Sequence, residues 1–169
     1  MPTPLRHLLS ILLLPFLVVV AVPYWLLTAF GTSGARWDDR SFIAWLSLLA
    51  GAILIILGLV LFSRCVSLFA RVGRGTLAPW DPTRSLVAAG PYRFVRNPMI
   101  GGVAVVLVGE ALLWGSWAIS IWAGVFVGIN HAYFVFFEEP GLEKRFGESY
   151  RIYKANVPRW IPRLKPWAG

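Results

Sequence analysis

The chain has 169 residues, of which 57% are hydrophobic and 14% are charged, and its formal net charge is +8. Soluble domains carry about a quarter charged residues, so this composition excludes an ordinary soluble fold. A single cysteine, Cys65, rules out an internal disulfide, and with only two histidines in the chain we expect no metal site.

Four apolar windows account for the hydropathy. Windows 8–30 and 41–63 contain no formal charge, and residues 99–137 contain one, Glu110, and are divided by Gly115–Ser116. About 20 apolar residues cross a bilayer as a helix. We therefore predict four transmembrane helices whose last two form a helical hairpin, at 8–30, 41–63, 99–114 and 117–137. A signal peptide is the alternative for the first window, but its apolar part is too long and no cleavage site follows cleanly.

The segments between the windows differ in charge. Residues 64–96 carry six arginines and one acid, residues 31–40 are neutral, and the tail from residue 138 has seven basic and four acidic residues. Positive charge marks the cytoplasmic side of a membrane, so we expect both termini in the cytosol. The basic excess then serves topology and attraction to anionic lipid heads, and no nucleic-acid partner is expected.

Residues 71–98 and 138–165 are expected to form a cytosolic cap on a single membrane domain, 1–169. In the tail, apolar and aromatic residues recur at spacings of four, four and three: Leu142, Phe146, Tyr150 and Tyr153. This spacing predicts one cytosolic amphipathic helix that stops before Val157–Pro158. Such a helix either lies on the membrane or covers a pocket.

Polar side chains inside the windows are candidate functional groups, because charge within a span is costly and usually faces the protein interior. Glu110 lies in the third helix, and Asn130 and His131 lie in the fourth; hydrogen bonds that only pack the bundle are the alternative. His131 and Glu138 are seven residues apart, which puts them on one face of an α-helix. The pair Glu138–Glu139 ends the fourth window and suits ribose hydroxyls, a cation or an arginine of the preceding loop.

Two motifs flank the hairpin. "GPYRFVRNPMIGG" occupies residues 90–102, and "EEPGLEKRFGESYRIYKANVPRWIP" begins at residue 138. With the hairpin between them, they resemble the isoprenylcysteine carboxyl methyltransferase and phospholipid methyltransferase superfamily over residues 85–162. The resemblance implies an all-α integral membrane enzyme that transfers a methyl group from S-adenosylmethionine to a lipid-borne acceptor. The Arg-Asn-Pro-Met form resembles bacterial members, which implies the bacterial inner membrane.

The resemblance also implies roles for particular residues. Arg96 is expected at the reacting centre, and the expected cofactor-binding residues are Tyr92, Asn97, Pro98, His131, Glu138, Glu139 and Tyr150. Asn97 stands where the family most often has histidine, which removes a group that titrates near neutral pH. Gly101 and Gly102 are expected to let the third helix pack closely.

Methyl transfer from a sulfonium needs alignment and exclusion of water rather than a nucleophilic side chain. A carboxylate acceptor, as in an isoprenylcysteine-like compound, needs a cation to hold it, and Arg96 is the candidate. An amine acceptor has to lose a proton, and Glu110 or His131 is the candidate base. Glu110 therefore joins Arg96 as an expected catalytic residue. The expected partners are a lipophilic small-molecule acceptor and membrane lipids. The sequence determines neither the identity of the acceptor nor the oligomeric state.

Two other functions compete with this interpretation. Membrane reductases that use NADPH look similar over the C-terminal region, but this chain is too short for their additional spans. A non-catalytic membrane scaffold is the other alternative. Binding of S-adenosylhomocysteine, of NADPH or of neither discriminates among the three.

Overall fold

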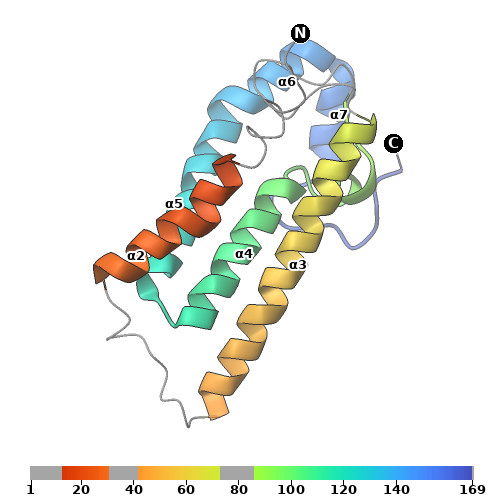
Figure 1. Cartoon of the computed structure of the whole chain (residues 1–169). Coiled ribbons are helices and arrows are strands. Elements are labelled where there is room, and N and C mark those ends of the chain that lie inside the picture. The colour runs from red at the N-terminus through yellow and green to blue at the C-terminus, as the bar shows by residue number, and fades with distance from the viewer. Residues whose placement is uncertain (1–12, 31–41, 73–85, 169) are drawn as a thin grey trace. The chain divides into compact units, whose positions relative to one another are not determined.

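The computed structural model describes residues 13–30, 42–72 and 86–168, and within these ranges the chain forms helices and no strand (Figure 1). The predicted all-helical class is therefore confirmed. Residues 73–85 of the predicted cap lie outside the described residues.

The described residues form a series of helical elements. In chain order they are a π-helical turn Leu17–Ala21, α2 (Val22–Phe30), α3 (Phe42–Val72), a 3-10 turn Gly90–Arg93, α4 (Pro98–Trp114), α5 (Trp117–Tyr133), a π-helical turn Phe134–Glu138, α6 (Glu139–Phe146) and α7 (Glu148–Asn156). The predicted hairpin is present, because α4 and α5 are separated only by Gly115 and Ser116 and Gly115 has a φ of 57°.

Within the described ranges, three helical stretches are long and apolar enough to cross a membrane: Leu13–Phe30, Phe42–Leu68 and Trp117–Phe146. The third predicted crossing, 99–114, corresponds to α4, whose 17 residues extend about 25 Å, slightly less than the thickness of a bilayer's hydrocarbon core. The number of crossings therefore stays a prediction. α3 continues to Val72, nine residues beyond the predicted end at 63.

The chain divides into two compact units. Unit 1 comprises Met1–Val60 and Gly102–Gly128, and unit 2 comprises Leu61–Gly101 and Ile129–Gly169. The two units are described separately below.

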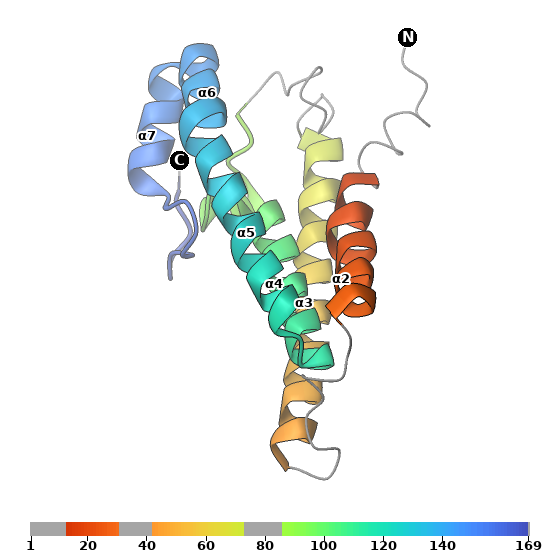
Figure 2. The ribbon, with the colours of Figure 1, turned by 90° about the vertical axis from the view of Figure 1, so that its left-hand side faces the viewer.

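In unit 1, α3 and α4 touch through glycines spaced seven residues apart on each helix. A Cβ added to Gly51 would lie 2.7 Å from the carbonyl oxygen of Gly109, and one added to Gly58 would lie 2.6 Å from that of Gly102. Figures 1 and 2 both show the two helices running side by side. Because a lipid-facing bundle gains little from burying apolar surface, such close backbone contact is a main source of cohesion.

The two glycines at the start of α4, Gly101 and Gly102, were both expected to pack closely, and only one of them does. Gly102 is in close contact through its carbonyl, as expected, but a Cβ on Gly101 would meet nothing within 4 Å. The prediction for Gly101 is therefore wrong, because adjacent residues point to different sides of a helix.

The first and last helical stretches of unit 1 are joined by a polar contact in an otherwise apolar setting. The indole Nε1–H of Trp122 on α5 donates to the carbonyl oxygen of Val18, at 3.0 Å. Val18 lies in the π-helical turn Leu17–Ala21. An edge-on contact between Phe30 and Trp117, with ring centroids 5.6 Å apart, joins the other ends of the same two stretches.

In unit 2, the predicted amphipathic helix of the tail is two helices. α6 and α7 are separated at Gly147, whose φ of 53° ends the helix in a conformation that glycine adopts readily. Figure 2 shows the two helices next to one another, with the chain turning sharply between them. The prediction of one continuous helix is therefore wrong, although its end at Asn156 is confirmed.

The predicted apolar face of the tail is real despite this break. Tyr150, Tyr153 and Val157 are buried in one cluster against partly buried side chains: Leu86, Ala88, Leu142, Phe146 and Trp167. The aromatic face is thus occupied by the chain itself. Residues before α4 and after α7 meet in this cluster, which brings the two motifs together.

Candidate functional site

The first motif forms a hinge between a 3-10 turn and α4. Gly90 has a φ of 54°, and Pro91 follows it at the start of the turn. The carbonyl of Asn97 accepts a hydrogen bond from Gly101 N–H at 2.9 Å, so Asn97 occupies the N-cap position of α4. Asparagine is favoured at an N-cap and proline at the next position, where Pro98 lies. Asn97 thus has a structural role as the N-cap of α4, and this role does not require a side chain that titrates.

The end of the second motif runs alongside this hinge through backbone hydrogen bonds. Arg96 N–H donates to the carbonyl of Pro158 at 2.9 Å, and Arg163 N–H donates to that of Phe94 at 2.9 Å. A third bond runs from Trp167 N–H to the Arg93 carbonyl at 3.0 Å. These pairs hold the tail against the hinge, so that side chains separated by more than 60 residues share one site.

An ionic cluster lies where the two motifs meet. Glu139 is buried, and its Oε1 accepts from Arg96 Nη1 at 3.0 Å and from Arg159 Nε at 2.7 Å. Its Oε2 lies 3.2 Å from the ammonium of Lys154. Arg96 is itself only 10% exposed at its side chain. The expected pairing of the acid pair with an arginine of the preceding loop is confirmed for Glu139 and Arg96.

Lys154 links this carboxylate to a second one. Its Nζ lies 2.7 Å from Glu143 Oε1, and this hydrogen bond, together with Glu139, raises the pKa of Lys154. The hydrogen bond that Arg159 donates to Glu139 likewise raises the pKa of Arg159. Lys154 and Arg159 therefore stay charged at neutral pH, and with Arg96 they are paired with the carboxylates of Glu139 and Glu143.

Three tyrosines surround the cluster. Tyr153 donates its hydroxyl to the carbonyl of Tyr92 at 2.8 Å, and both rings are buried. Burial raises the pKa of Tyr92, Tyr150 and Tyr153, with the charge of Glu138 adding to the effect on Tyr92 and Tyr150. A guanidinium hydrogen bond from Arg96 opposes the rise at Tyr150. The phenols are thus neutral hydrogen-bond donors, and Glu138 lies close to two of them.

His131, one of the two candidate polar residues of the fourth predicted helix, contacts Trp160 in unit 2. Trp160 Nε1–H donates to His131 Nδ1 at 3.1 Å, and the two rings stack at 6.4 Å between centroids. The π-helical turn Phe134–Glu138 lies between His131 and Glu138 and adds a residue to the helical turn. The predicted common α-helical face of these two residues is therefore wrong.

Glu110 belongs to unit 1 and is not part of the cluster in unit 2. It lies half-buried on α4, and its Oε2 is buried without a hydrogen-bond partner within the described residues. The same is true of one atom of the cluster, the Nε of Arg96. Each of these two residues, the expected catalytic pair, thus keeps one unpaired polar atom.

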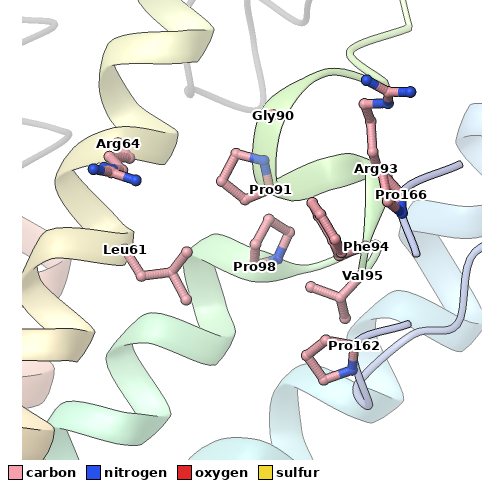
Figure 3. Close-up of a pocket in the computed structure, with 10 residues that line it drawn as sticks. All are labelled: Leu61, Arg64, Gly90, Pro91, Arg93, Phe94, Val95, Pro98, Pro162 and Pro166. Atoms are coloured by element: carbon pink, nitrogen blue, oxygen red, sulfur yellow. The ribbon is translucent and has the colours of Figure 1, made fainter. Parts of the chain in front are cut away.

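Unit 2 also contains a cavity of about 610 Å³ on the hinge (Figure 3). Its lining is mainly apolar and includes four prolines: Leu61, Arg64, Gly90, Pro91, Arg93, Phe94, Val95, Pro98, Pro162 and Pro166. Of the predicted cofactor-binding residues, Pro98 alone lines it. The hinge therefore supplies Arg96 to the ionic cluster and its apolar residues to this pocket.

Five predicted site residues come together: Tyr92, Arg96, Glu138, Glu139 and Tyr150. Sequence reasoning missed two cations of the same cluster, Lys154 and Arg159. Lys154 lies one residue after Tyr153 and four after Tyr150, so its helical position was available as a signal. Arg159 had no such signal, because it follows the end of α7. Among the described residues, no group of acids, histidines and cysteines is arranged to hold a metal.

Residues 46–149 match the model of a family described as phospholipid methyltransferase, which with the apolar helices supports a membrane methyltransferase. This match covers more than half of the chain, and the protein belongs to that family. Both Arg96 and Glu139 lie within the matched range, whereas Arg159 lies beyond it.

The chain is also similar to a protein that is named as a methyltransferase. Over 98 residues the chain is 29% identical to a phosphatidylethanolamine N-methyltransferase of Zygosaccharomyces rouxii. The aligned part is 54% of this chain but only 11% of the relative. The chain thus spans about one-tenth of the length of that protein, whose whole activity does not carry over.

Proposed function

We propose that this protein transfers a methyl group from S-adenosylmethionine to a lipophilic acceptor that carries an anionic group. The observation that supports this most is the buried contact between Arg96 and Glu139, which joins two motifs 43 residues apart in the chain. A chain that only packs helices has no need to bury Arg96 and Glu139 together, since burying charge costs several kcal/mol per ion.

The residues present fit the proposed cofactor. Bound S-adenosylmethionine would supply a methyl group already activated by its sulfonium. Glu138 takes part in no ion pair among the described residues, so its carboxylate is available to ribose hydroxyls or an ammonium group. The neutral hydroxyl of Tyr150 offers a donor beside it. These side chains bind and orient, and no covalent role is required of any of them.

Arg96 is proposed to hold the anionic group of the acceptor. Its guanidinium is planar and always charged, and one of its donors, Nε–H, is buried without a partner. A carboxylate acceptor, as in an isoprenylcysteine-like compound, meets this requirement directly. So does a phosphate-bearing lipid whose amine is methylated, and the named relative acts on such a lipid. In that second case the amine must also lose a proton before it accepts the methyl group.

The cavity on the hinge is proposed to hold the apolar part of the acceptor. Its walls include Leu61, Phe94 and Val95, which offer no hydrogen bonds from their side chains. Such a mainly apolar pocket suits a lipid chain better than a polar cofactor. We also propose that this unit faces the cytosol, as the distribution of basic residues predicts.

The decisive experiment is incubation of the purified protein with methyl-labelled S-adenosylmethionine and a total lipid extract. Transfer of label to a lipid species is expected, and the labelled species identifies the acceptor. Calorimetry with S-adenosylhomocysteine and with NADPH provides the second measurement. Binding of NADPH alone would replace this proposal with the reductase alternative, and binding of neither with no label transferred would support a scaffold.

A further inference from the structure

The ionic cluster has a feature that cofactor binding by Glu139 does not explain. Both oxygens of Glu139 are already engaged, Oε1 by two guanidinium donors and Oε2 by an ammonium. Only 7% of its side chain is exposed. A carboxylate with three cationic donors of its own chain and so little exposed surface is better placed to hold those cations than to bind a ligand.

The cations around Glu139 are in the opposite situation. Arg96, Lys154 and Arg159 have Glu139 and Glu143 as their ion-pair partners, and these contacts do not use every donor of the three side chains. The leftover donor is also identified, because Arg96 Nε–H is buried without a partner in a side chain that is nine-tenths buried. A buried donor of this kind costs free energy unless a ligand completes it.

We infer that Arg96 and Arg159 form a binding site for an oxyanion, assembled in advance by Glu139, which acts as a positioning residue. The ligand is a carboxylate or phosphate group, because planar guanidinium groups bind such oxygens with paired, charge-assisted hydrogen bonds. Lys154 completes the cluster and joins it to Glu143. The inference deepens the proposed function, since it concerns the same cluster, but its first test does not depend on methyl transfer.

The arrangement explains why a carboxylate lies at the centre of an anion site. Two guanidinium groups repel each other. Oε1 of Glu139 offsets this repulsion because it accepts from Arg96 Nη1 at 3.0 Å and from Arg159 Nε at 2.7 Å. Arg159 comes from the tail beyond α7, where nothing helical fixes it. Its contact with Glu139 therefore decides where its guanidinium lies. Without that contact, the site keeps its charge but loses its geometry.

This reasoning predicts the sign of one substitution. Glu139→Gln raises the net positive charge of the cluster by one, so simple attraction predicts tighter binding of an anion. A positioning role predicts weaker binding, by about tenfold or more, since at least one charge-assisted hydrogen bond to the anion is lost. Glu139→Asp keeps the charge and should recover part of the loss.

The first test uses inorganic phosphate as the probe on the full chain in an uncharged detergent. Unfolding temperature is measured in phosphate and in chloride at equal ionic strength, over a range of concentrations. Wild type should be stabilised by phosphate, and Arg159→Gln and Glu139→Gln should need about ten times more of it. Arg151→Gln and Glu148→Gln are the matched controls, because that pair is exposed and lies outside the cluster. They should behave as wild type.

Several outcomes would overturn the inference. It is wrong if wild type gains nothing from phosphate beyond the chloride effect, if Arg159→Gln binds phosphate as wild type does, or if Glu139→Gln binds it equally or more tightly. Should Glu139→Gln fail to fold, Arg159→Lys keeps the inference testable. It retains the charge and loses the planar fork, so its affinity should fall between those of wild type and Arg159→Gln.

The second test identifies the source of the oxyanion. Calorimetry compares S-adenosylhomocysteine with methylthioadenosine, which lacks the amino-acid carboxylate. If Arg159→Gln weakens binding of the first compound alone, the cofactor carboxylate is the ligand. If it leaves both unchanged and raises KM for the lipid acceptor, the anion belongs to the lipid. No change in any of these overturns the inference, whereas a wild-type protein that binds neither compound refutes the proposed function instead.

Discussion

The close contact between α3 and α4 in unit 1 makes a quantitative prediction for Gly109→Ala. A Cβ at this position would lie 2.8 Å from the carbonyl oxygen of Gly51 and 2.9 Å from the backbone nitrogen of Ile55. Ordinary contact begins at 3.4 Å, so the first approach is about 0.6 Å too short. Both obstructing atoms are backbone, and a rotamer change cannot relieve them. The two helices therefore have to separate locally.

The expected cost follows from two opposing effects. Overpacking a tight contact costs about 1–3 kcal/mol. Replacing glycine by alanine inside a helix gains about 0.5–1 kcal/mol from the restricted unfolded chain. Gly109→Ala should thus be destabilising by about 1–2 kcal/mol. The matched control is Gly124→Ala on α5, where an added Cβ meets nothing within 4 Å. It should be neutral or stabilising.

The assay is thermal unfolding of the purified variants in one detergent, at a fixed scan rate because membrane proteins often unfold irreversibly. A cost of this size should lower the apparent Tm by several degrees. The double variant Gly51→Ala with Gly109→Ala should cost less than the two single changes added together, since both disturb the same contact. If Gly109→Ala were as stable as Gly124→Ala, the glycine contact would not hold the helices together and the reasoning would be refuted.

Three further predictions concern unit 2. Tyr153→Phe should destabilise the protein by about 1–3 kcal/mol in thermal unfolding, because it leaves the buried carbonyl of Tyr92 without its donor. Lys154→Gln should flatten the loss of stability in alkaline solution. The raised pKa of Lys154 means that its contribution is fully present below its ordinary value of 10.5 and is lost as pH rises through the higher folded value. Trp160→Phe should cost about 0.5–1 kcal/mol, since the stacking on His131 is kept and one exposed hydrogen bond is lost.

Each of these three has a control of the same kind. Tyr133→Phe removes a hydroxyl from a side chain that is 46% exposed and should change little. Lys144→Gln removes an exposed lysine outside the cluster and should leave the alkaline limb as steep as in wild type. Trp114→Phe removes the N–H of an exposed indole and should change the free energy of unfolding little. A control that matches its test variant would contradict the assigned contact.

Much of the fold could be predicted from the sequence, because hydropathy and punctuation are local signals. The apolar windows gave the helices, and Gly115 gave the hairpin turn. The break at Gly147 was missed because the aromatic spacing of four, four and three continues through it. The π-helical turn Phe134–Glu138 carries no sequence signal of its own, so the phase between His131 and Glu138 was misjudged.

The site divides in the same way. Arg96 was identified through the resemblance of its motif to a methyltransferase family. Glu139 was identified through that resemblance and through its place at the end of an apolar window. Arg159 was overlooked as a ligand of Glu139, since its place depends on backbone hydrogen bonds between the tail and the hinge. Such pairings join residues far apart in the chain. They leave no periodic pattern in either segment.

Those tail-to-hinge hydrogen bonds have a consequence for how the protein is made. Synthesis proceeds from the N-terminus, so every helix through α7 is translated before Pro158, Arg163 and Trp167, whose backbones bond the hinge. The contact between Arg159 and Oε1 of Glu139 therefore cannot form until residue 159 has left the ribosome. A nascent chain can therefore have its apolar helices in the membrane before the ionic cluster around Glu139 is complete.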